Sequence, residues 1–242
     1  VSGPRGAAAG FAAVSPSGRY AAAAGVRSNF TDWNCFHAGW YADHPGAWYA
    51  AGWATGAAWR AATWGTVGSW FAYSGVQPVY YDYGNTVVYQ DNSVYVNGQD
   101  QGTAEQYYNQ AASLAQTGSQ AQVSNEGDWL PLGVFALCQS GQSTSNLVLQ
   151  LAVNKQGIIR GNYTDGVGGK SNLVQGSVDK QTQRAAFTIG DNQSTVIETG
   201  IYNLTKDEAP CLVHFGSDRT EQWLMVRMQE QQQNGQQGGQ QE

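Results

Sequence analysis

From Trp129 to Met228 the chain alternates apolar and polar residues with a period of two. In "NLVLQLAVN" the residues Leu147, Leu149, Leu151 and Val153 fall on one side, and the opposite positions are less uniformly apolar. Similar runs recur with short connections between them, such as "NKQG" and "GDNQ". About eight strands, with turn signals every ten residues or so, predict an antiparallel meander that closes as a barrel or folds into a sandwich.

The stretch "PVYYDYGNTVVYQDNSVYVNGQ" predicts a β-hairpin at the start of a second unit, residues 79–118. β-Branched and aromatic residues alternate with polar ones on either side of Gln90, Asp91 and Asn92, which predicts two short strands joined by a tight turn. Asn97 and Gly98 predict a second turn. At least one edge of this hairpin is expected to need partners or water for its backbone groups.

A helix is expected directly after the hairpin, in "TAEQYYNQAASLAQTG". Thr103 suits the N-cap, Gln106 stands at the capping-box position, and Gly118 is expected past the end. Residues 119–128 are predicted to be a polar linker. Tyr107, Ala111 and Leu114 are expected to share one face of this helix.

The N-terminal part divides by composition into two segments. Residues 1–27 are rich in Ala, Gly and Ser, and we expect a flexible arm. Residues 28–78 hold seven of the nine tryptophans and are expected to be partly helical. Residues 229–242 form a tail rich in Gln and Gly. The chain as a whole is therefore predicted to be mainly β with a helical N-terminal part, an α+β fold.

The tryptophan-rich segment has a regular spacing. Trp48, Trp59 and Trp70 are eleven residues apart, and so are Trp53 and Trp64. Eleven residues make almost three helical turns, so a continuous helix would carry two tryptophan stripes. Five such rings exceed what one surface helix can hide. We therefore predict an interaction segment in which these five tryptophans meet other parts of the protein or neighbouring copies.

A membrane-spanning helix is disfavoured for the same segment. Between Trp48 and Ala72 the strongly inserting residues are Val67 and Phe71, and Arg60 lies near the middle. Tryptophan also prefers the membrane interface to its core. The segment is expected to break at one or more of its glycines, Gly52, Gly56, Gly65 or Gly68.

Charge excludes two classes of partner. Only 12% of residues are charged, the formal net charge is −6, and the 12 Lys and Arg are scattered. A nucleic-acid reader needs a basic stripe that releases counterions from phosphates. An anionic membrane surface makes the same demand. We therefore expect neither nucleic acid nor an anionic membrane as partner.

Catalytic and metal-binding patterns are weak throughout. "CFHAGWYADH" offers Cys35, His37, Asp43 and His44, but their spacing matches no defensible metal site. His214 lies in the apolar run "CLVHFG", where a barrel-wall histidine is expected rather than a general base. We predict no enzyme activity, no cofactor and no metal.

Cys138 and Cys211 are expected to be buried strand residues. A disulfide between them would require Cα atoms about 4.4 to 6.8 Å apart. Four N-x-S/T sequons fit an exported chain, although they arise easily in this composition. They lie at Asn29, Asn162, Asn192 and Asn203.

Several long strings resemble one protein family. They are "HPGAWYAAGW", "AAWRAATW", "PVYYDYGNTVVYQDNSVYVNGQ", "DWLPLGVFAL", "LQLAVNKQGIIRGNY", "GSVDKQTQRAAFTIGD" and "ETGIYNLTKDEAPCLVHFGSDRTEQWLMVR". The chain resembles, over about residues 28–228, exported planctomycete proteins often labelled mu-protocadherin-like cell-surface proteins. The resemblance implies an extracytoplasmic location. It implies no calcium site, because the acidic ligand motifs of a cadherin are lacking in this sequence.

The leading hypothesis is a non-enzymatic structural or interaction protein of an extracytoplasmic assembly, such as a coat, fibre or envelope layer. Low charge, the aromatic segment and the absence of a recognisable active-site motif favour it. Its partners would be copies of itself, joined through the tryptophan-rich segment with the barrel displayed, and other envelope or surface proteins. The alternative is a small-ligand carrier with a pocket inside the barrel, since eight strands leave just enough room for one small molecule.

Overall fold

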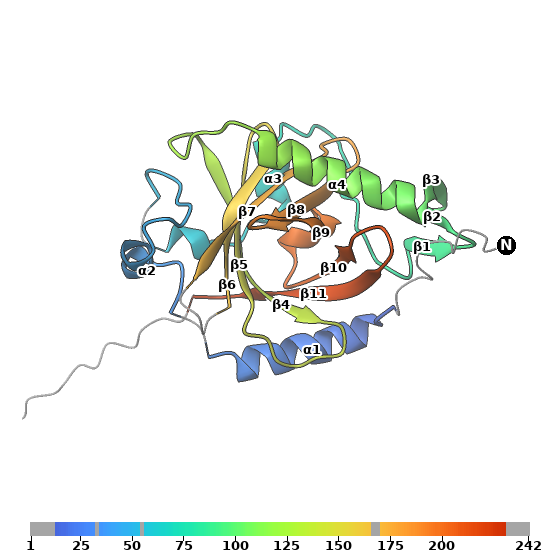
Figure 1. The fold of residues 1–242 in the computed structure, drawn as a ribbon, viewed down its shortest axis with the longest axis horizontal. Coiled ribbons are helices and arrows are strands. Elements are labelled where there is room, and N and C mark those ends of the chain that lie inside the picture. The colour runs from blue at the N-terminus through green and yellow to red at the C-terminus, as the bar shows by residue number, and fades with distance from the viewer. Residues whose placement is uncertain (1–12, 32–33, 54–55, 166–169, 231–242) are drawn as a thin grey trace, which may run out of the picture.

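Eight antiparallel strands close into a barrel, so the predicted meander is a barrel and not a sandwich (Figure 1). The structure, a computed structural model, describes residues 13–31, 34–53, 56–165 and 170–230. Around the barrel the order is β10-β11-β4-β5-β6-β7-β8-β9. The bounds are β4 Trp129–Gln139, β5 Val148–Asn154, β6 Ile158–Thr164, β7 Ser171–Val178, β8 Arg184–Ile189, β9 Asn192–Gly200, β10 Glu208–Phe215 and β11 Thr220–Met228.

Both faces of the barrel wall are buried, and β5 shows this most clearly. All seven of its residues are buried. Leu149, Leu151 and Val153 belong to the core inside the barrel. Val148 and Ala152 point the other way and pack in separate clusters on the outer wall. This double burial explains why the alternation of apolar and polar residues in the sequence is incomplete.

One end of the barrel is closed by helix α3 (Trp64–Trp70). Val67 and Phe71 join the interior core together with Ile201 and Leu204, which follow β9. Thr63 caps the helix and forms a capping box with Thr66. Part of the tryptophan-rich segment therefore acts as a plug.

The rest of that segment lies on the outer wall. Helix α2 (Ala38–Asp43) and the 3-10 turn η1 (Ala57–Trp59) are short, so the segment is broken as predicted. Gly52 and Gly56 have φ values of 76° and 79°, a conformation that interrupts a helix and that glycine adopts at little cost. Gly65 and Gly68 lie within α3 instead.

The flexible arm predicted for residues 1–27 is wrong for its second half. Helix α1 (Pro16–Asn29) packs on β10 and β11. Its buried Arg19 forms an ion pair of 2.6 Å with Asp82, and Val26 is fully buried. These tertiary contacts order a stretch too poor in large apolar groups to be helical alone. Residues 1–12, and 231–242 of the predicted tail, lie outside the described residues.

A three-stranded sheet stands beside the barrel in the order β1-β2-β3. Its strands are β1 (Val87–Gln90), β2 (Ser93–Val96) and β3 (Gln99–Thr103). The tight turn is present as predicted: it consists of Asp91 and Asn92, with φ values of 48° and 66°, and Gln90 is the last residue of β1. The free edge expected for the hairpin is partly occupied: β3 pairs with β2, and on the other side the Val87 carbonyl accepts from the Gly84 amide.

Helix α4 (Ala104–Gln120) covers β7, β8 and β9. The capping box of Thr103 and Gln106 is present, as predicted. Gly118 was expected past the end of the helix but lies inside it. A glycine is needed at this position because a Cβ there would fall 1.8 Å from the Gly176 carbonyl oxygen of β7. The linker expected over 119–128 therefore begins after Gln120.

The N-terminal half thus wraps the barrel. Figure 1 shows α1 and α4 on opposite sides of it, and the tryptophan-rich segment and the small sheet fill the space between. The expectation that the barrel is a displayed module with its apolar face hidden inside is wrong. Its outer wall is also apolar, and residues N-terminal to Trp129 cover it.

Candidate functional site

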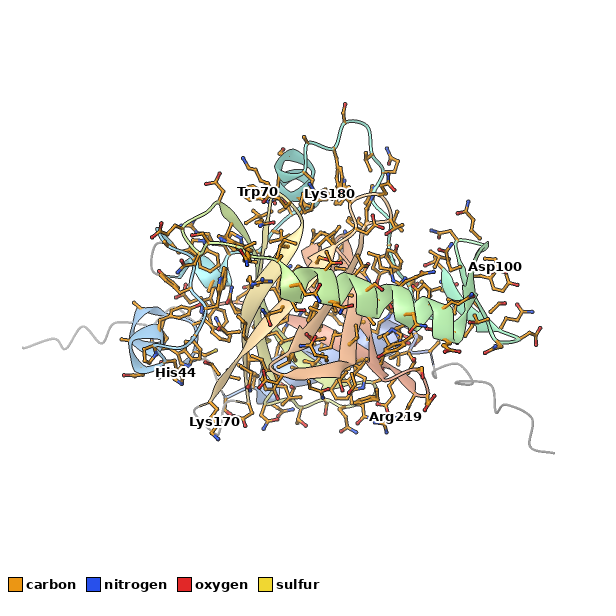
Figure 2. The ribbon with its side chains drawn as sticks, turned by 45° about the horizontal axis from the view of Figure 1, so that its top comes forward. His44, Trp70, Asp100, Lys170, Lys180 and Arg219 are labelled. Carbon is orange, nitrogen blue, oxygen red and sulfur yellow. The ribbon has the colours of Figure 1, made fainter. Side chains whose placement is uncertain are left out.

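A groove of about 1200 Å³ lies outside the barrel. Helix α4 forms one wall and residues Val79 to Tyr81 form the other. It runs from the turn between β7 and β8, beside Lys180, to the sheet that carries Asp100 (Figure 2). Its lining is Val79, Tyr81, Val96, Asn97, Gln99, Gln101, Gln106, Tyr107, Asn109, Gln110, Ser113, Leu114, Thr117, Asp179, Gln181, Thr182 and Arg184.

One face of α4 supplies the first wall. Gln106, Gln110, Ser113 and Thr117 follow one another at spacings of three or four, so they share a side of the helix. The neighbouring face carries Ala111 and other small residues against the barrel. The helix can lie close to the barrel because these residues are small, and its polar face is left along the groove.

Val79 and Tyr81, which also line the groove, lie in a segment outside the strands that is held by the side-chain amides of Gln183 and Asn203. The Val79 amide donates to Gln183 Oε1 (2.8 Å), and Gln183 Nε2 donates to the Gln77 carbonyl (2.8 Å). Asn203 does the same for Tyr81, accepting from its amide at 3.0 Å and donating to its carbonyl at 2.9 Å. Each amide binds backbone as a neighbouring β-strand would.

The groove is nearly uncharged. Among its lining residues only Asp179 and Arg184 carry charge. Asp179 Oδ1 accepts from the Gln181 and Thr182 amides, which fixes the turn. Arg184 is paired behind the groove and is 5% exposed. A ligand therefore meets amides, hydroxyls and a few apolar side chains.

A buried charge cluster lies behind Arg184. Its guanidinium donates to Glu198 Oε2 at 2.8 Å and to the Tyr107 carbonyl at 2.7 Å. It also stacks on the Tyr107 ring at 3.6 Å. Burial by itself would raise the pKa of Glu198, but Arg184 and His214 outweigh it and lower that pKa to about 2. Glu198 is thus a carboxylate that joins the groove wall to the barrel.

His214 is the residue on which an enzyme would depend, and polar groups do converge on it. Its Nε2 lies 2.9 Å from Glu198 Oε2 and its Nδ1 lies 2.9 Å from Thr220 Oγ1. Since an ionised carboxylate only accepts, Nε2 carries a proton. Both ring nitrogens are engaged and the side chain is fully buried, so the ring offers neither nitrogen to a substrate.

The five tryptophans predicted as interaction residues lie on the protein's own barrel and not in the groove. Trp59 is buried, and its indole donates to the Cys35 carbonyl. Trp48 and Trp53 are half-buried beside Trp129, and Trp64 and Trp70 are half-buried at the plugged end. Intramolecular packing accounts for much of their surface. Contact with another copy through them stays a prediction.

The other residues singled out from the sequence are separate from the groove. His37 caps α2 and His44 stacks on Trp40, while Cys35 is buried. The described residues hold no group of three or more His, Cys, Asp or Glu placed to bind a metal ion. Cys138 and Cys211 are buried, as predicted, and both are free thiols.

Two of the sequon asparagines are structural. Asn162 accepts from the Trp48 amide at 2.8 Å and donates to its carbonyl at 2.7 Å. Asn203 binds Tyr81 in the same way. Both side chains are fully buried, so neither can carry a glycan in the folded protein. Asn29 and Asn192 are exposed.

The space inside the barrel is filled by apolar side chains, among them Phe135, Phe187 and Met225, which are fully buried. A carrier needs a cavity there, so the carrier alternative stays a prediction without support from the packing. The groove was missed because four separate segments line it. The sequence offered one partial indication: Arg184 directly precedes the apolar residues Ala185 to Phe187, and Glu198 follows the apolar pair Val196 and Ile197.

No family model, curated protein or solved structure matches this chain. Across the described residues, none of the helices combines the length and hydrophobicity that crossing a bilayer requires. The groove's geometry and chemistry therefore carry the functional argument.

Proposed function

We propose that this chain is a non-enzymatic interaction module of an extracytoplasmic assembly, and that the groove along α4 is its binding surface. The observation that carries the proposal is a groove of about 1200 Å³ whose lining is almost wholly neutral amides, hydroxyls and apolar groups. Ligand sites are concave surfaces of mixed apolar and polar character. The resemblance of residues 28–228 to exported surface proteins favours the location.

The groove suits binding better than chemistry. Its lining offers neither a nucleophile beside a base nor a pair of facing carboxylates. Asp179 in the lining binds the amides of its own turn, and behind the groove Arg184 and His214 both pair with Glu198 and are buried. We assign the intermolecular contact to the groove and not to the tryptophan-rich segment, because the groove is open whereas the tryptophans lie against the barrel.

The test uses a tagged protein produced in its source organism. Ser113→Trp places a large ring in the groove from an exposed helix position. Gln116→Trp makes the same change at an exposed position of α4 that does not line the groove. The proposal expects the envelope fraction to retain the parent protein and the Gln116 variant, and to lose the Ser113 variant.

Equal retention of the two variants would show that the groove is not the binding surface. Recovery of the parent protein from the cytoplasm alone would contradict the location. Matching far-UV circular dichroism spectra of both variants would establish that α4 and the barrel are intact.

A further inference from the structure

The geometry points to an extended, uncharged polypeptide segment as the ligand of the α4 groove, recognised through side-chain amides. This inference rests on the proposed function and names its ligand class. Three observations support it. Side-chain amides already bind backbone groups within this protein, other amides in the groove have no partner in the described chain, and the groove has the length and the neutral lining that such a segment needs.

At three places, side-chain amides bind the backbone of segments that lie outside the strands. Asn162 clamps Trp48, Asn203 clamps Tyr81, and Gln183 bridges Gln77 and Val79. A primary amide presents one acceptor and donors side by side. An extended residue presents an N–H and a C=O on the same side, so the two groups are complementary.

The groove presents the same group in open form. The side-chain amides of Asn97, Gln99, Asn109 and Gln181 are on exposed residues that line it. Across the described residues, none of these four side-chain amides forms a hydrogen bond with another part of the protein. Gln106 uses its Oε1 to accept from the Thr103 amide, which leaves its Nε2 for a ligand. Donors and acceptors therefore stand along α4, at the small sheet and at the turn between β7 and β8.

The length of the groove sets the size of the segment. From Gln106 to Thr117 the helix advances about 16 Å, at about 1.5 Å per residue. An extended chain covers that length with about five residues. Val79, Val96 and Leu114 are half-buried in the lining and can receive small apolar side chains from alternate positions of the ligand.

Strand addition at β3, the strand of the small sheet that contributes most to the groove, is hindered, so the recognition falls to side chains. On β3 the Gly102 amide donates to Asp100 Oδ1, and the Gln101 carbonyl accepts from Gln110 Nε2. The Thr103 amide is bound by Gln106. These bonds cover edge groups that a peptide strand would otherwise use.

A saccharide fits less well, because sugar rings pack their C–H faces on exposed aromatic rings. Tyr81 and Tyr107 line the groove but are only 3% and 1% exposed. Acidic ligands are disfavoured by Asp179 and by the net charge of −6, because Arg184 is already paired with Glu198. A neutral peptide is the remaining class with matching hydrogen bonds.

The test is a titration of the isotope-labelled full chain, followed by NMR of the side-chain NH2 groups. The probes are a capped heptapeptide alternating Gln and Val, the same peptide with Glu for Gln, the Gln peptide N-methylated on its backbone, and cellopentaose. The Gln peptide is expected to shift the resonances of Asn109 and Gln181 saturably. The other three probes are expected to leave them unchanged.

Variants locate the contact. Asn109→Ala removes one amide from an exposed helix position, where alanine favours the helix, and is expected to raise the Kd about fivefold. Ser113→Trp is expected to abolish the shifts, and Gln116→Trp to preserve them. Absence of shifts with the Gln peptide, or shifts that survive Ser113→Trp, would overturn the inference.

Binding of the N-methylated peptide as tightly as its parent would overturn backbone recognition. Shifts with cellopentaose that Ser113→Trp abolishes would overturn the polypeptide class. In each of these cases the envelope-retention experiment still decides the proposed function separately, because it depends only on whether the groove is needed.

Discussion

The Glu198 carboxylate offers the sharpest test of how the groove wall is held to the barrel. Glu198→Gln removes the charge and keeps a similar shape, so Arg184 stays buried at 5% exposure without its ion-pair partner. Breaking a buried pair on one side costs about 3–5 kcal/mol. A carboxyl whose pKa falls from 4.5 to about 2 on folding contributes about 3 kcal/mol at neutral pH, which agrees in magnitude.

The sign of the pH dependence follows from the same shift. The folded-state pKa is below the unfolded value, so the stabilisation is complete above pH 4.5 and is lost as the pH falls toward 2. Urea unfolding at pH 7 and pH 3, followed by tryptophan fluorescence and circular dichroism, measures the free energy of unfolding. The stability difference between parent and Glu198→Gln is expected to be about 3–5 kcal/mol at pH 7 and smaller at pH 3.

Two further variants complete this test. Asp128→Asn breaks an exposed pair with Lys155, whose side chains are 79% and 57% exposed, and is expected to change stability by less than about 0.5 kcal/mol. Arg184→Met combined with Glu198→Gln removes both charges and should be less damaging than the sum of the single changes. A loss below about 1 kcal/mol for Glu198→Gln, or strict additivity, would refute the reasoning.

Three more outcomes are expected. In a fragment of residues 129–228, apolar residues on the outer wall such as Val134 and Val226 lose their cover. This fragment is therefore expected to bind a hydrophobic dye and to aggregate, and a folded, monomeric fragment would contradict the expectation. Gly118→Ala should destabilise by about 1–3 kcal/mol in urea unfolding, whereas Gly46→Ala, with open space around it, should not; equal effects would contradict the close α4–β7 contact. All three cysteines should titrate as free thiols after denaturation, and a single free thiol would show a disulfide. In the folded protein they should react slowly because all three are buried, and burial raises the pKa of the Cys138 thiol to about 11.

The elements whose formation depends on neighbouring residues in the sequence were predicted from local patterns. The alternation in "NLVLQLAVN" gave β5, Thr103 and Gln106 gave the start of α4, and Asp91 with Asn92 gave the hairpin turn. The strands could be counted, but barrel closure depends on the pairing of β9 with β10 and of β4 with β11, which no single strand encodes.

The features that could not be predicted depend on contacts between residues far apart in the sequence. Helix α1 has few large apolar residues, and it is ordered by partners such as Asp82 that lie far along the chain. The groove could not be predicted from the sequence, because its amides and hydroxyls match no sequence motif and come together only when four separate segments fold side by side. The five tryptophans were expected to need more cover than one helix provides. The barrel's outer wall covers Trp48, Trp53 and Trp59, and the plugged end covers Trp64 and Trp70.

The wrapping of the barrel by residues N-terminal to it has a kinetic consequence. These residues are synthesised before the wall that they bind, which runs from Trp129 to Met228. At about 5–20 residues per second, that interval lasts ~5–20 s. The aromatic segment has no native partner until then, and its contacts join residues far apart in sequence, which slows folding. The last strand of the barrel therefore sets the moment at which the first half of the chain can fold.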